Sequence, residues 1–225
     1  MIGPKAIIHL DRLKTNYDLV KKQVGNKSIM AVVKANGYGH GSIACAKALE
    51  SHGCDYFSVF TMDEGIELRR AGIKSDILVF SRMDTARFAE AINDNLTLNI
   101  SHVKDQSALI SYYKIHGQCP KVHLKVDTGM TRLGIDIKDA PDMIEQLNDN
   151  PGIDCEGIYS HFATADEGEL SYAYEQESKF DSVLDKARNR GYTFKYVHFS
   201  NSGAALNMDQ SNYNIVRIGM LLYGA

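Results

Sequence analysis

The chain has 225 residues, of which 44% are hydrophobic, so it is long enough to form one large barrel or two small domains around a substantial core. Its formal net charge of −3 provides no basic surface for nucleic acid, and nucleic-acid partners are not expected. No apolar stretch approaches the length of a membrane span, and the N-terminus has no cationic segment leading into an apolar one. We therefore expect no membrane association and a cytoplasmic location.

The four cysteines, Cys45, Cys54, Cys119 and Cys155, are scattered and contain no Cys-x-x-Cys pair. Three of them fall in expected helices or strands, which favours buried, reduced thiols over disulfides or a zinc site. The histidines form no ligand motif either, so no metal ion is expected.

The N-terminal segment predicts two elements before the first strongly patterned one. Residues 5–9 (Lys-Ala-Ile-Ile-His) are a short strand candidate. Asp11 can cap a helix that carries Leu13, Tyr17 and Val20 at helical spacing.

The sequence Val-Lys-Ala-Asn-Gly-Tyr-Gly-His-Gly over residues 33–41 follows an apolar run, 29–33, typical of a strand buried on both faces. A helix is expected to begin near Ser42. Lys34 thus stands at the end of a strand, beside a turn that we expect only glycines to form, where α/β proteins place their chemistry. The glycine spacing differs from the Rossmann fingerprint. A desolvated lysine amine here can form a Schiff base with an aldehyde, and the alternative is a surface lysine before a loop.

Strand-like and helix-like segments alternate along the rest of the chain. Helical segments include 63–72, which we expect to end at Gly72, and 171–191. With the run at 29–33, the strand-like runs number eight, which predicts an α/β fold of the (β/α)₈ TIM-barrel type and not an open doubly wound sheet. The other seven runs are 56–60, 77–80, 97–100, 122–126, 153–160, 196–199 and 215–218.

Polar residues at the ends of two of these runs indicate a site. Alternation along 122–127 places Lys125 on the same face as His123. If that face is interior, the lysine must be paired or neutralised, and the alternative is a surface salt bridge. The turn after 196–199 is rich in small residues and opens a helix, which suits a phosphate, with Ser202 as the hydroxyl or as an ordinary N-cap.

The segment around Lys34 resembles the pyridoxal-phosphate lysine signature of alanine racemases. Met-Thr-Arg-Leu-Gly (130–134) and Tyr-Ser-His-Phe-Ala (159–163) extend the resemblance over essentially the whole chain. It implies a fold type III enzyme with pyridoxal 5′-phosphate as cofactor, whose single N-terminal barrel domain would be residues 1–225. It also implies that Lys34 holds the cofactor as an internal aldimine and moves the Cα proton of alanine, which supplies D-alanine for peptidoglycan (isomerase, EC 5.1.1.1). Serine remains an alternative substrate.

The resemblance also assigns the residues that hold the cofactor phosphate. Tyr38 reaches the phosphate from the glycine-rich turn, although a half-buried loop tyrosine is an equal reading of its spacing. Ser202, with Asn201 beside it, and Gly219, with the backbone of Met220, complete the phosphate site.

Around the cofactor ring, the resemblance implies that His161 packs against the pyridine and that Arg217 faces the ring nitrogen. Because an arginine can only donate, the ring nitrogen stays unprotonated, which favours fast reprotonation of Cα. Arg132 is implied near the cofactor hydroxyl and the substrate carboxylate, where its planar fork fits. Lys125 is implied to be carbamylated (N6-carboxylysine), an anion that can hold an arginine.

Racemisation needs a second base on the opposite face of the ring. The family takes it from a tyrosine on a C-terminal β-rich domain of the other subunit of a homodimer. Since this chain ends soon after the last strand-like run, we expect that domain to be missing and the chain alone to be inactive or severely impaired. The helix before the first strand could instead fill the place of an eighth helix in the ring.

Two alternative functions share parts of these motifs. A single-domain pyridoxal-phosphate carrier without catalytic turnover has a similar length, but its motifs differ from those around Lys34, Arg132 and His161. A decarboxylase of the same barrel type shares the Val-Lys-Ala-Asn start, but it would need consecutive glycines for the phosphate, and this sequence has no Gly-Gly pair.

Overall fold

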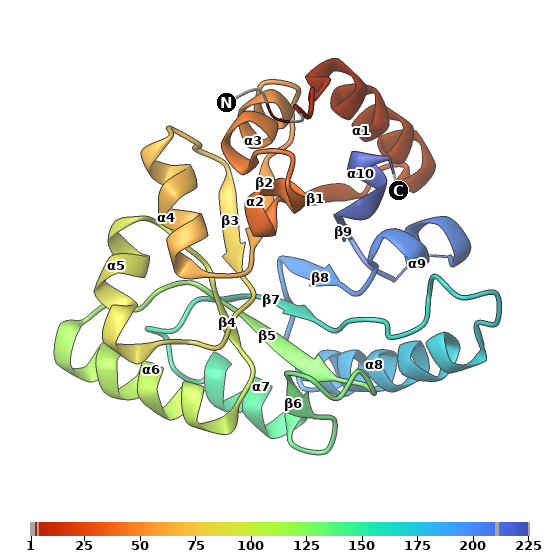
Figure 1. Cartoon of the computed structure of the whole chain (residues 1–225). Helices are drawn as coiled ribbons and strands as arrows, with labels where there is room; N and C mark the ends of the chain where they lie inside the picture. Colours follow the sequence, from red (N-terminus) through yellow and green to blue (C-terminus); the bar gives the residue numbers. More distant parts are fainter. Residues whose placement is uncertain (1–2, 4, 210–211, 225) are drawn as a thin grey trace.

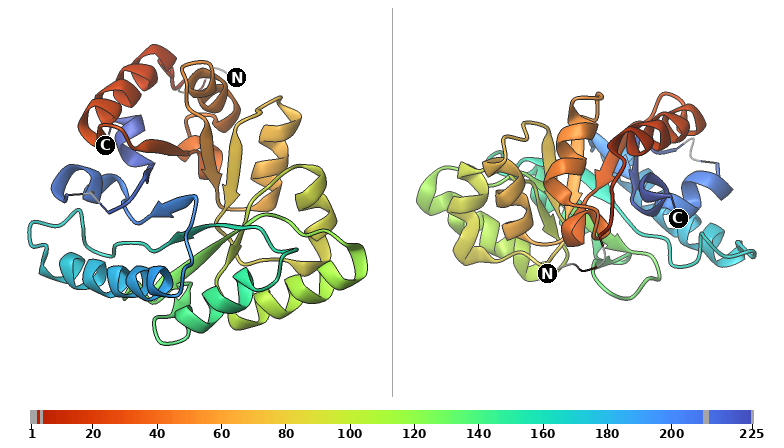
Figure 2. Two further views of the ribbon diagram at one scale, coloured as in Figure 1. Left: turned by 180° about the vertical axis from the view of Figure 1, so that it is seen from behind. Right: turned by 45° about the horizontal axis from the view of Figure 1, so that its top comes forward.

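The computed structural model describes residues 3, 5–209 and 212–224, and its parallel strands form a barrel surrounded by helices (Figure 1). Figure 2 shows the same ring from behind and tipped forward, with the helices outside the strands. The alternation in the sequence therefore predicted the (β/α)₈ architecture correctly. Within the described residues, the barrel strands are β1 (Ser28–Val32), β2 (Tyr56–Val59), β3 (Asp76–Val79), β4 (Leu98–Ile100), β5 (Val122–Asp127), β7 (Cys155–Tyr159), β8 (Tyr196–His198) and β9 (Ile215–Ile218).

The ring of strands closes through two seams between its two halves. One half has the order β3-β2-β1-β9, and the other has the order β4-β5-β7-β8, with the short strand β6 (Ile135–Asp136) paired to β5. At the first seam Val79 N–H donates to Thr97 O at 2.9 Å. At the second, Asn214 N–H donates to Val197 O at 3.1 Å and Arg217 N–H to Ser200 O at 3.0 Å. Closure pairs the strand edges that an open sheet would expose.

Helices cover the outside of the ring. The helix α1 (Leu10–Val24) packs against α3 (Ser42–Glu50) and α10 (Met220–Tyr223), so the helix that precedes β1 lies beside the segment that follows β9 (Figure 1). Among the described helices, none is both long and apolar enough to cross a lipid bilayer. The helices are α1 (Leu10–Val24), α3 (Ser42–Glu50), α4 (Met62–Arg70), a 3₁₀ turn (Thr85–Arg87), α5 (Phe88–Asn93), α6 (Val103–His116), α7 (Ala140–Asn148), α8 (Ser171–Asn189), α9 (Ser202–Asn207) and α10 (Met220–Tyr223), besides a short turn, α2, described below.

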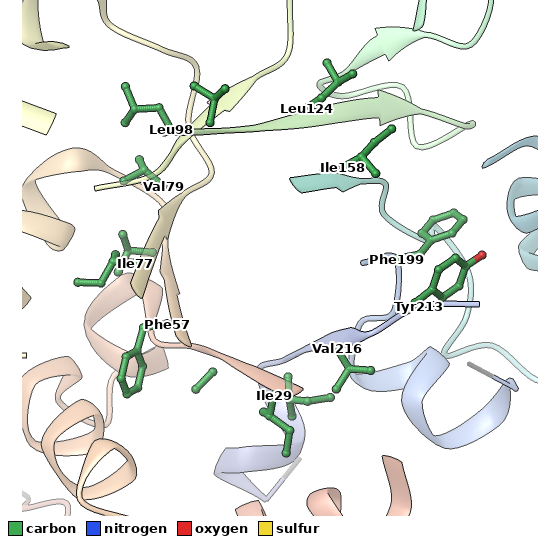
Figure 3. Packing of buried hydrophobic residues seen from close by; sticks show 14 of the residues in the cluster. Ile29, Phe57, Ile77, Val79, Leu98, Leu124, Ile158, Phe199, Tyr213 and Val216 are labelled. Atoms are coloured by element: carbon green, nitrogen blue, oxygen red, sulfur yellow. The ribbon is translucent and has the colours of Figure 1, made fainter. Parts of the chain in front are cut away.

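Side-chain alternation divides the core into two layers. Outward-facing residues such as Phe57, Leu124 and Val216 pack between the strands and the helices (Figure 3). Inward-facing residues fill the barrel, where Met30, Tyr56, Leu78 and Ile215 form a small apolar cluster. The remaining inward positions are largely polar and buried, and include Thr97, Asn99, His123, Lys125, His198 and Arg217. Buried polar groups are costly without partners, and Asn99, His123, His198 and Arg217 each have hydrogen-bond partners inside the barrel.

Two predictions for the N-terminal segment are wrong. Residues 5–9 form no strand and lead directly into α1. Ile7 is 77% exposed, so the apolar residues of this segment do not face the core, and no strand pairs with it in the described structure. His9, and not Asp11, occupies the N-cap of α1, while Asp11 lies in the first turn, where a negative charge favours the helix dipole.

Helix ends and thiols agree with expectation more closely. α3 begins at Ser42 as predicted. α4 ends at Arg70, two residues before Gly72, whose φ of +97° is of the kind that stops a helix. The four cysteines are free thiols, of which Cys45 and Cys54 are buried.

The turn that carries Lys34 differs from the prediction that only glycines form it. Over α2 (Lys34–Tyr38), Ala35, Asn36 and Tyr38 have φ of 51°, 53° and 52°, so three non-glycine residues take the left-handed conformation together with Gly37. Such residues cost about 1 kcal/mol or more each, and they persist only where neighbours hold them. Two contacts hold this turn: Ala35 N–H donates to Glu64 Oε1 at 2.6 Å, and Asn36 Oδ1 accepts from Ser42 N–H at 3.0 Å.

We predict that Asn36→Ala destabilises the chain by about 1–2 kcal/mol, because it removes a side-chain cap at the start of α3 and places alanine in the left-handed region. Asn36→Asp keeps an acceptor and tolerates the conformation, so its free energy of unfolding should stay within about 0.5 kcal/mol of the parent. Urea unfolding followed by circular dichroism measures both, and equal stability of Asn36→Ala and the parent would contradict the role of this contact.

Candidate active site

A cavity of about 710 Å³ opens at the carboxyl ends of the strands. All ten residues that the sequence singled out line it, although they come from five separate stretches of the chain. They are Lys34, Tyr38, Lys125, Arg132, His161, Asn201, Ser202, Arg217, Gly219 and Met220. A barrel brings such positions together because every parallel strand ends at the same face.

Lys34 follows β1 and projects its amine into this cavity, with Nζ 6.0 Å from the centre of the Tyr38 ring. Burial and the positive charge of Arg132 lower the pKa of Lys34, while the Glu64 carboxylate opposes part of that shift. A lysine with a lowered pKa has a larger neutral fraction, which is the form that attacks a carbonyl carbon.

Lys125 lies inside the barrel, as strand alternation predicted, and its side chain is 5% exposed, so it is not a surface residue. Its Nζ lies 5.6 Å from the centre of the Tyr159 ring. Burial, followed by the charges of Arg217 and Arg132, lowers the pKa of Lys125 to about 8. An amine of this pKa is partly neutral near pH 7, which is the form that carbamylation by carbon dioxide requires.

Asp127, at the end of β5, shapes the loop that presents Arg132. One carboxylate oxygen, Oδ1, accepts from Gly129 N–H at 2.9 Å and from Thr131 N–H at 3.0 Å. Thr131 has φ of 53°, and Gly134 packs so closely that an added Cβ would lie 2.6 Å from Asp127 N. The turn is thereby fixed at both ends, and Arg132 is held at the cavity.

The hydroxyl of Ser202 and the backbone of Gly219 meet at one end of the cavity. Gly219 N–H donates to Ser202 Oγ at 3.1 Å, so the Ser202 hydroxyl keeps its own hydrogen to donate elsewhere. A Cβ at Gly219 would lie 2.6 Å from the hydroxyl oxygen of Tyr38, so only glycine leaves this space open. Asn201 is the N-cap of α9, because its Oδ1 accepts from Ala204 N–H at 3.0 Å, and the N-cap reading of Ser202 is wrong.

Arg217 lies at the floor of the cavity, 4% exposed, and its terminal nitrogens are paired with β8 and with the residues that follow β7 and β8. Nη2 shares its two hydrogens among Ser160 O at 2.8 Å, Phe199 O at 2.9 Å and His161 Nδ1 at 3.1 Å, and Nη1 donates to His198 Nδ1 at 2.8 Å. Because a guanidinium can only donate, both imidazoles must accept at Nδ1 and are neutral. Burial and then the charge of Arg217 hold the pKa values of His161 and His198 well below their usual range, in agreement with that state.

The floor also contains residues to which the sequence assigned no role. The Tyr159 ring stacks on His198 at 4.6 Å with an 8° angle between planes, and its hydroxyl donates to Asn99 Oδ1 at 2.9 Å. Arg217 Cζ lies 5.2 Å from the centre of the same ring. The signal available in the sequence was alternation, which places Tyr159 and His198 on inward positions of their strands.

We predict that Arg132→Met raises the pKa values of both Lys34 and Lys125, because it removes a positive charge that disfavours a second ammonium. The lysines can be methylated with ¹³C-formaldehyde in buffer free of carbon dioxide and titrated by NMR. Arg12→Met, on the exposed face of α1, is the control and should move neither signal. If Arg132→Met leaves the pKa values of both lysines unchanged, the charge of Arg132 does not act on them and the prediction is wrong.

Comparison with known proteins adds to this geometry. The family described as "Alanine racemase, N-terminal domain" matches residues 8–225. Alanine racemase 2 of Caldanaerobacter subterraneus subsp. tengcongensis is 37% identical over 97% of the chain and 57% of its own length. Alanine racemase of Desulforamulus reducens is 39% identical over 97% of the chain and 60% of its own length.

Solved structures agree with these relatives. Alanine racemase of Clostridium difficile 630 in complex with cycloserine is 35% identical with a TM-score of 0.92, covering 97% of this chain and 60% of that one. Alanine racemase from Bacillus anthracis with bound L-Ala-P is 32% identical with a TM-score of 0.88, covering 99% of this chain and 59% of that one. The chain thus spans about three fifths of the length of these relatives. With residues 8–225 matched, the chain belongs to the alanine racemase family, and its barrel corresponds to the N-terminal domain of that family.

Proposed function

We propose that the chain is the pyridoxal 5′-phosphate-binding barrel of an alanine racemase, an isomerase that interconverts L- and D-alanine. The observation that carries this proposal is the convergence of all ten expected residues on one cavity. Residues 1–225 are proposed as a single cofactor-binding domain. The full-length enzyme is proposed to be a cytoplasmic homodimer that supplies D-alanine for peptidoglycan.

The cavity fits this cofactor in two respects. At Gly219 a side chain would fill the space next to the Tyr38 hydroxyl, and the Ser202 hydroxyl has a hydrogen left to donate, so the three positions form a small cradle suited to a phosphate. For the aldehyde of the cofactor, Lys34 offers an amine whose pKa is lowered by burial and by Arg132. Asn201 and the backbone of Met220 flank the cradle.

When bound, pyridoxal phosphate supplies an aldehyde for a lysine amine and an electron-withdrawing ring that makes the Cα hydrogen of an amino acid more acidic. Lys34 is the residue that would hold this aldehyde, and its amine would take and return the proton at Cα of the substrate. Arg217, fixed by its four acceptors, can only donate and therefore limits the electron withdrawal, which favours return of the proton. His161 would pack against the ring.

The substrate carboxylate is proposed to bind Arg132, whose planar fork matches it. Alanine is the proposed substrate because the relatives are alanine racemases, and serine is the alternative. Carbamylation of Lys125 would replace a cation that Arg132 and Arg217 destabilise with an anion that they favour.

The second base is proposed to come from outside this barrel, from a partner subunit. The tyrosines that line the cavity are Tyr38, assigned to the phosphate, and Tyr159, whose hydroxyl is directed to Asn99. Exposed apolar side chains also surround the opening, with Phe60 48%, Leu206 53% and Met220 48% exposed. Apolar rims of this kind mark surfaces that further protein covers.

We predict that the chain turns yellow with pyridoxal phosphate and that borohydride then fixes the cofactor mass on Lys34. Lys34→Ala should bind without covalent fixation, whereas Lys125→Met should still be labelled at Lys34. Peptide mass spectrometry locates the label, and a label on Lys125, or on no lysine, would refute the assignment.

We also predict that the chain exchanges the Cα hydrogen of D-alanine for deuterium but interconverts the enantiomers far more slowly than an intact enzyme. One base suffices for exchange, whereas inversion needs proton transfer on both faces, and each positioned base contributes about 10²–10⁴-fold. NMR in D₂O follows exchange, and chiral chromatography follows inversion, with Lys34→Ala as the control. Inversion at about 10 per second would place the second base within these residues. Cofactor binding with no exchange would favour the carrier function instead.

A further inference from the structure

A line of buried side chains continues from Arg217 through the barrel, away from the cavity. Arg217 Nη1 lies 2.8 Å from His198 Nδ1, and His198 Nε2 lies 2.9 Å from His123 Nδ1. His123 Nε2 in turn lies 3.2 Å from the Tyr56 hydroxyl and 3.7 Å from Glu156 Oε1. Both histidines are 0% exposed, so water does not compete for these positions.

The direction of every hydrogen bond in this line follows from its first member. Arg217 can only donate, so His198 Nδ1 accepts, and the proton of the neutral His198 ring is on Nε2. That N–H donates to His123 Nδ1, which leaves the His123 proton on Nε2. This last N–H points to the Tyr56 hydroxyl, with the Glu156 carboxylate behind it.

The far end of the line is negatively charged. Burial favours the neutral acid of Glu156, but the contact with His123 and the charges of Lys121 and Lys195 hold its pKa below the usual value. The Thr97 hydroxyl donates to Glu156 Oε1 at 3.2 Å, which fixes this oxygen. A fixed acceptor at this end selects the Nε2–H tautomer of His123 and so the acceptor state of its Nδ1.

The strands make room for His123 specifically. A Cβ at Gly157, the neighbouring position on β7, would lie 2.6 Å from His123 Nε2 and 2.7 Å from two ring carbons. The β5–β7 register shifts between Val122 and His123, next to this contact. Glycine weakens a strand interior, so its presence here indicates a close approach that the fold requires.

We propose that His123 is a positioning residue for Arg217: through His198 it completes a one-directional hydrogen-bond line that runs from the guanidinium to the Tyr56 hydroxyl, beside the Glu156 carboxylate, and holds the guanidinium at the cavity floor. The structural part of this inference stands on the barrel interior alone. Its consequence for the cofactor rests on the proposed function, in which Arg217 faces the pyridine ring.

The tautomers provide the direct test, on the ligand-free chain. In ¹⁵N-histidine-labelled protein at pH 7, long-range ¹⁵N–¹H spectra should show both His198 and His123 as neutral Nε2–H rings. A His198 ring protonated at Nδ1, or on both nitrogens, would overturn the proposal, because Arg217 could not then donate to it.

Paired substitutions at His123 test the consequence for cofactor binding. His123→Phe keeps a ring without an acceptor, so it should shift the His198 nitrogens and raise the Kd for pyridoxal phosphate about tenfold, the loss expected for one orphaned buried donor. His123→Asn places its amide oxygen near the former Nδ1 and should keep the Kd within about threefold of the parent. His116→Asn, at the exposed end of α6, is the control. Thermal unfolding reports whether each variant is folded. If His123→Phe does not fold, the tautomer spectra of the parent chain decide whether the proposal holds.

The outcomes separate this inference from the proposed function. If the parent chain binds no pyridoxal phosphate but shows both Nε2–H tautomers, the proposed function fails and the hydrogen-bond line stands. If the parent binds the cofactor, and His123→Phe is folded, binds equally well and leaves the His198 signals in place, the positioning role is refuted.

Discussion

Burial of the Arg217 guanidinium is the constraint on which the barrel interior depends. Removing an unpaired charge from water costs far more than the burial of one apolar side chain returns, so the acceptors must be in place. They are two carbonyl oxygens and two imidazoles supplied by β8 and the segments that follow β7 and β8. The backbone of Arg217 also donates to Ser200 O across the seam between β8 and β9. Closing the barrel and satisfying the arginine are therefore accomplished by the same alignment of strands.

The charge of the cavity follows from this arrangement. Lys34, Lys125, Arg132 and Arg217 all line it, and each lysine has its pKa lowered by burial and by neighbouring cations. Such a site gains free energy from anions, and the proposed ligands carry them as a phosphate and a carboxylate. Burial and the same repulsion shift both lysines toward the neutral form, which is the reactive form of an amine. Binding of anions and nucleophilic reactivity thus have one electrostatic origin.

The barrel and the cavity residues could be predicted because both depend on local patterns. Alternation of strands and helices gave the architecture, and positions at strand ends, read with the family resemblance, gave residues that the structure brings together. The errors lie where contacts with other elements determine the local conformation. Residues 5–9 have the composition of a strand but no partner, and the turn after Lys34 is left-handed at Ala35 because Glu64, from another element, holds its N–H. The contact between His123 and His198 joins residues 75 positions apart, which no pattern in one strand can reveal.

Two glycines leave space for polar groups in and around the barrel interior. Gly219 leaves space for the Tyr38 hydroxyl at the cavity, and Gly157 leaves space for the buried His123 ring inside the barrel. Gly157 lies inside β7, where a glycine costs about 0.5–1 kcal/mol relative to alanine, so the stability of its own strand does not explain it. Each admits a polar group that would otherwise be excluded by a Cβ. The His123 ring reaches Arg217 through His198, so the placement of the guanidinium depends on the packing of the strands as well as on the cavity.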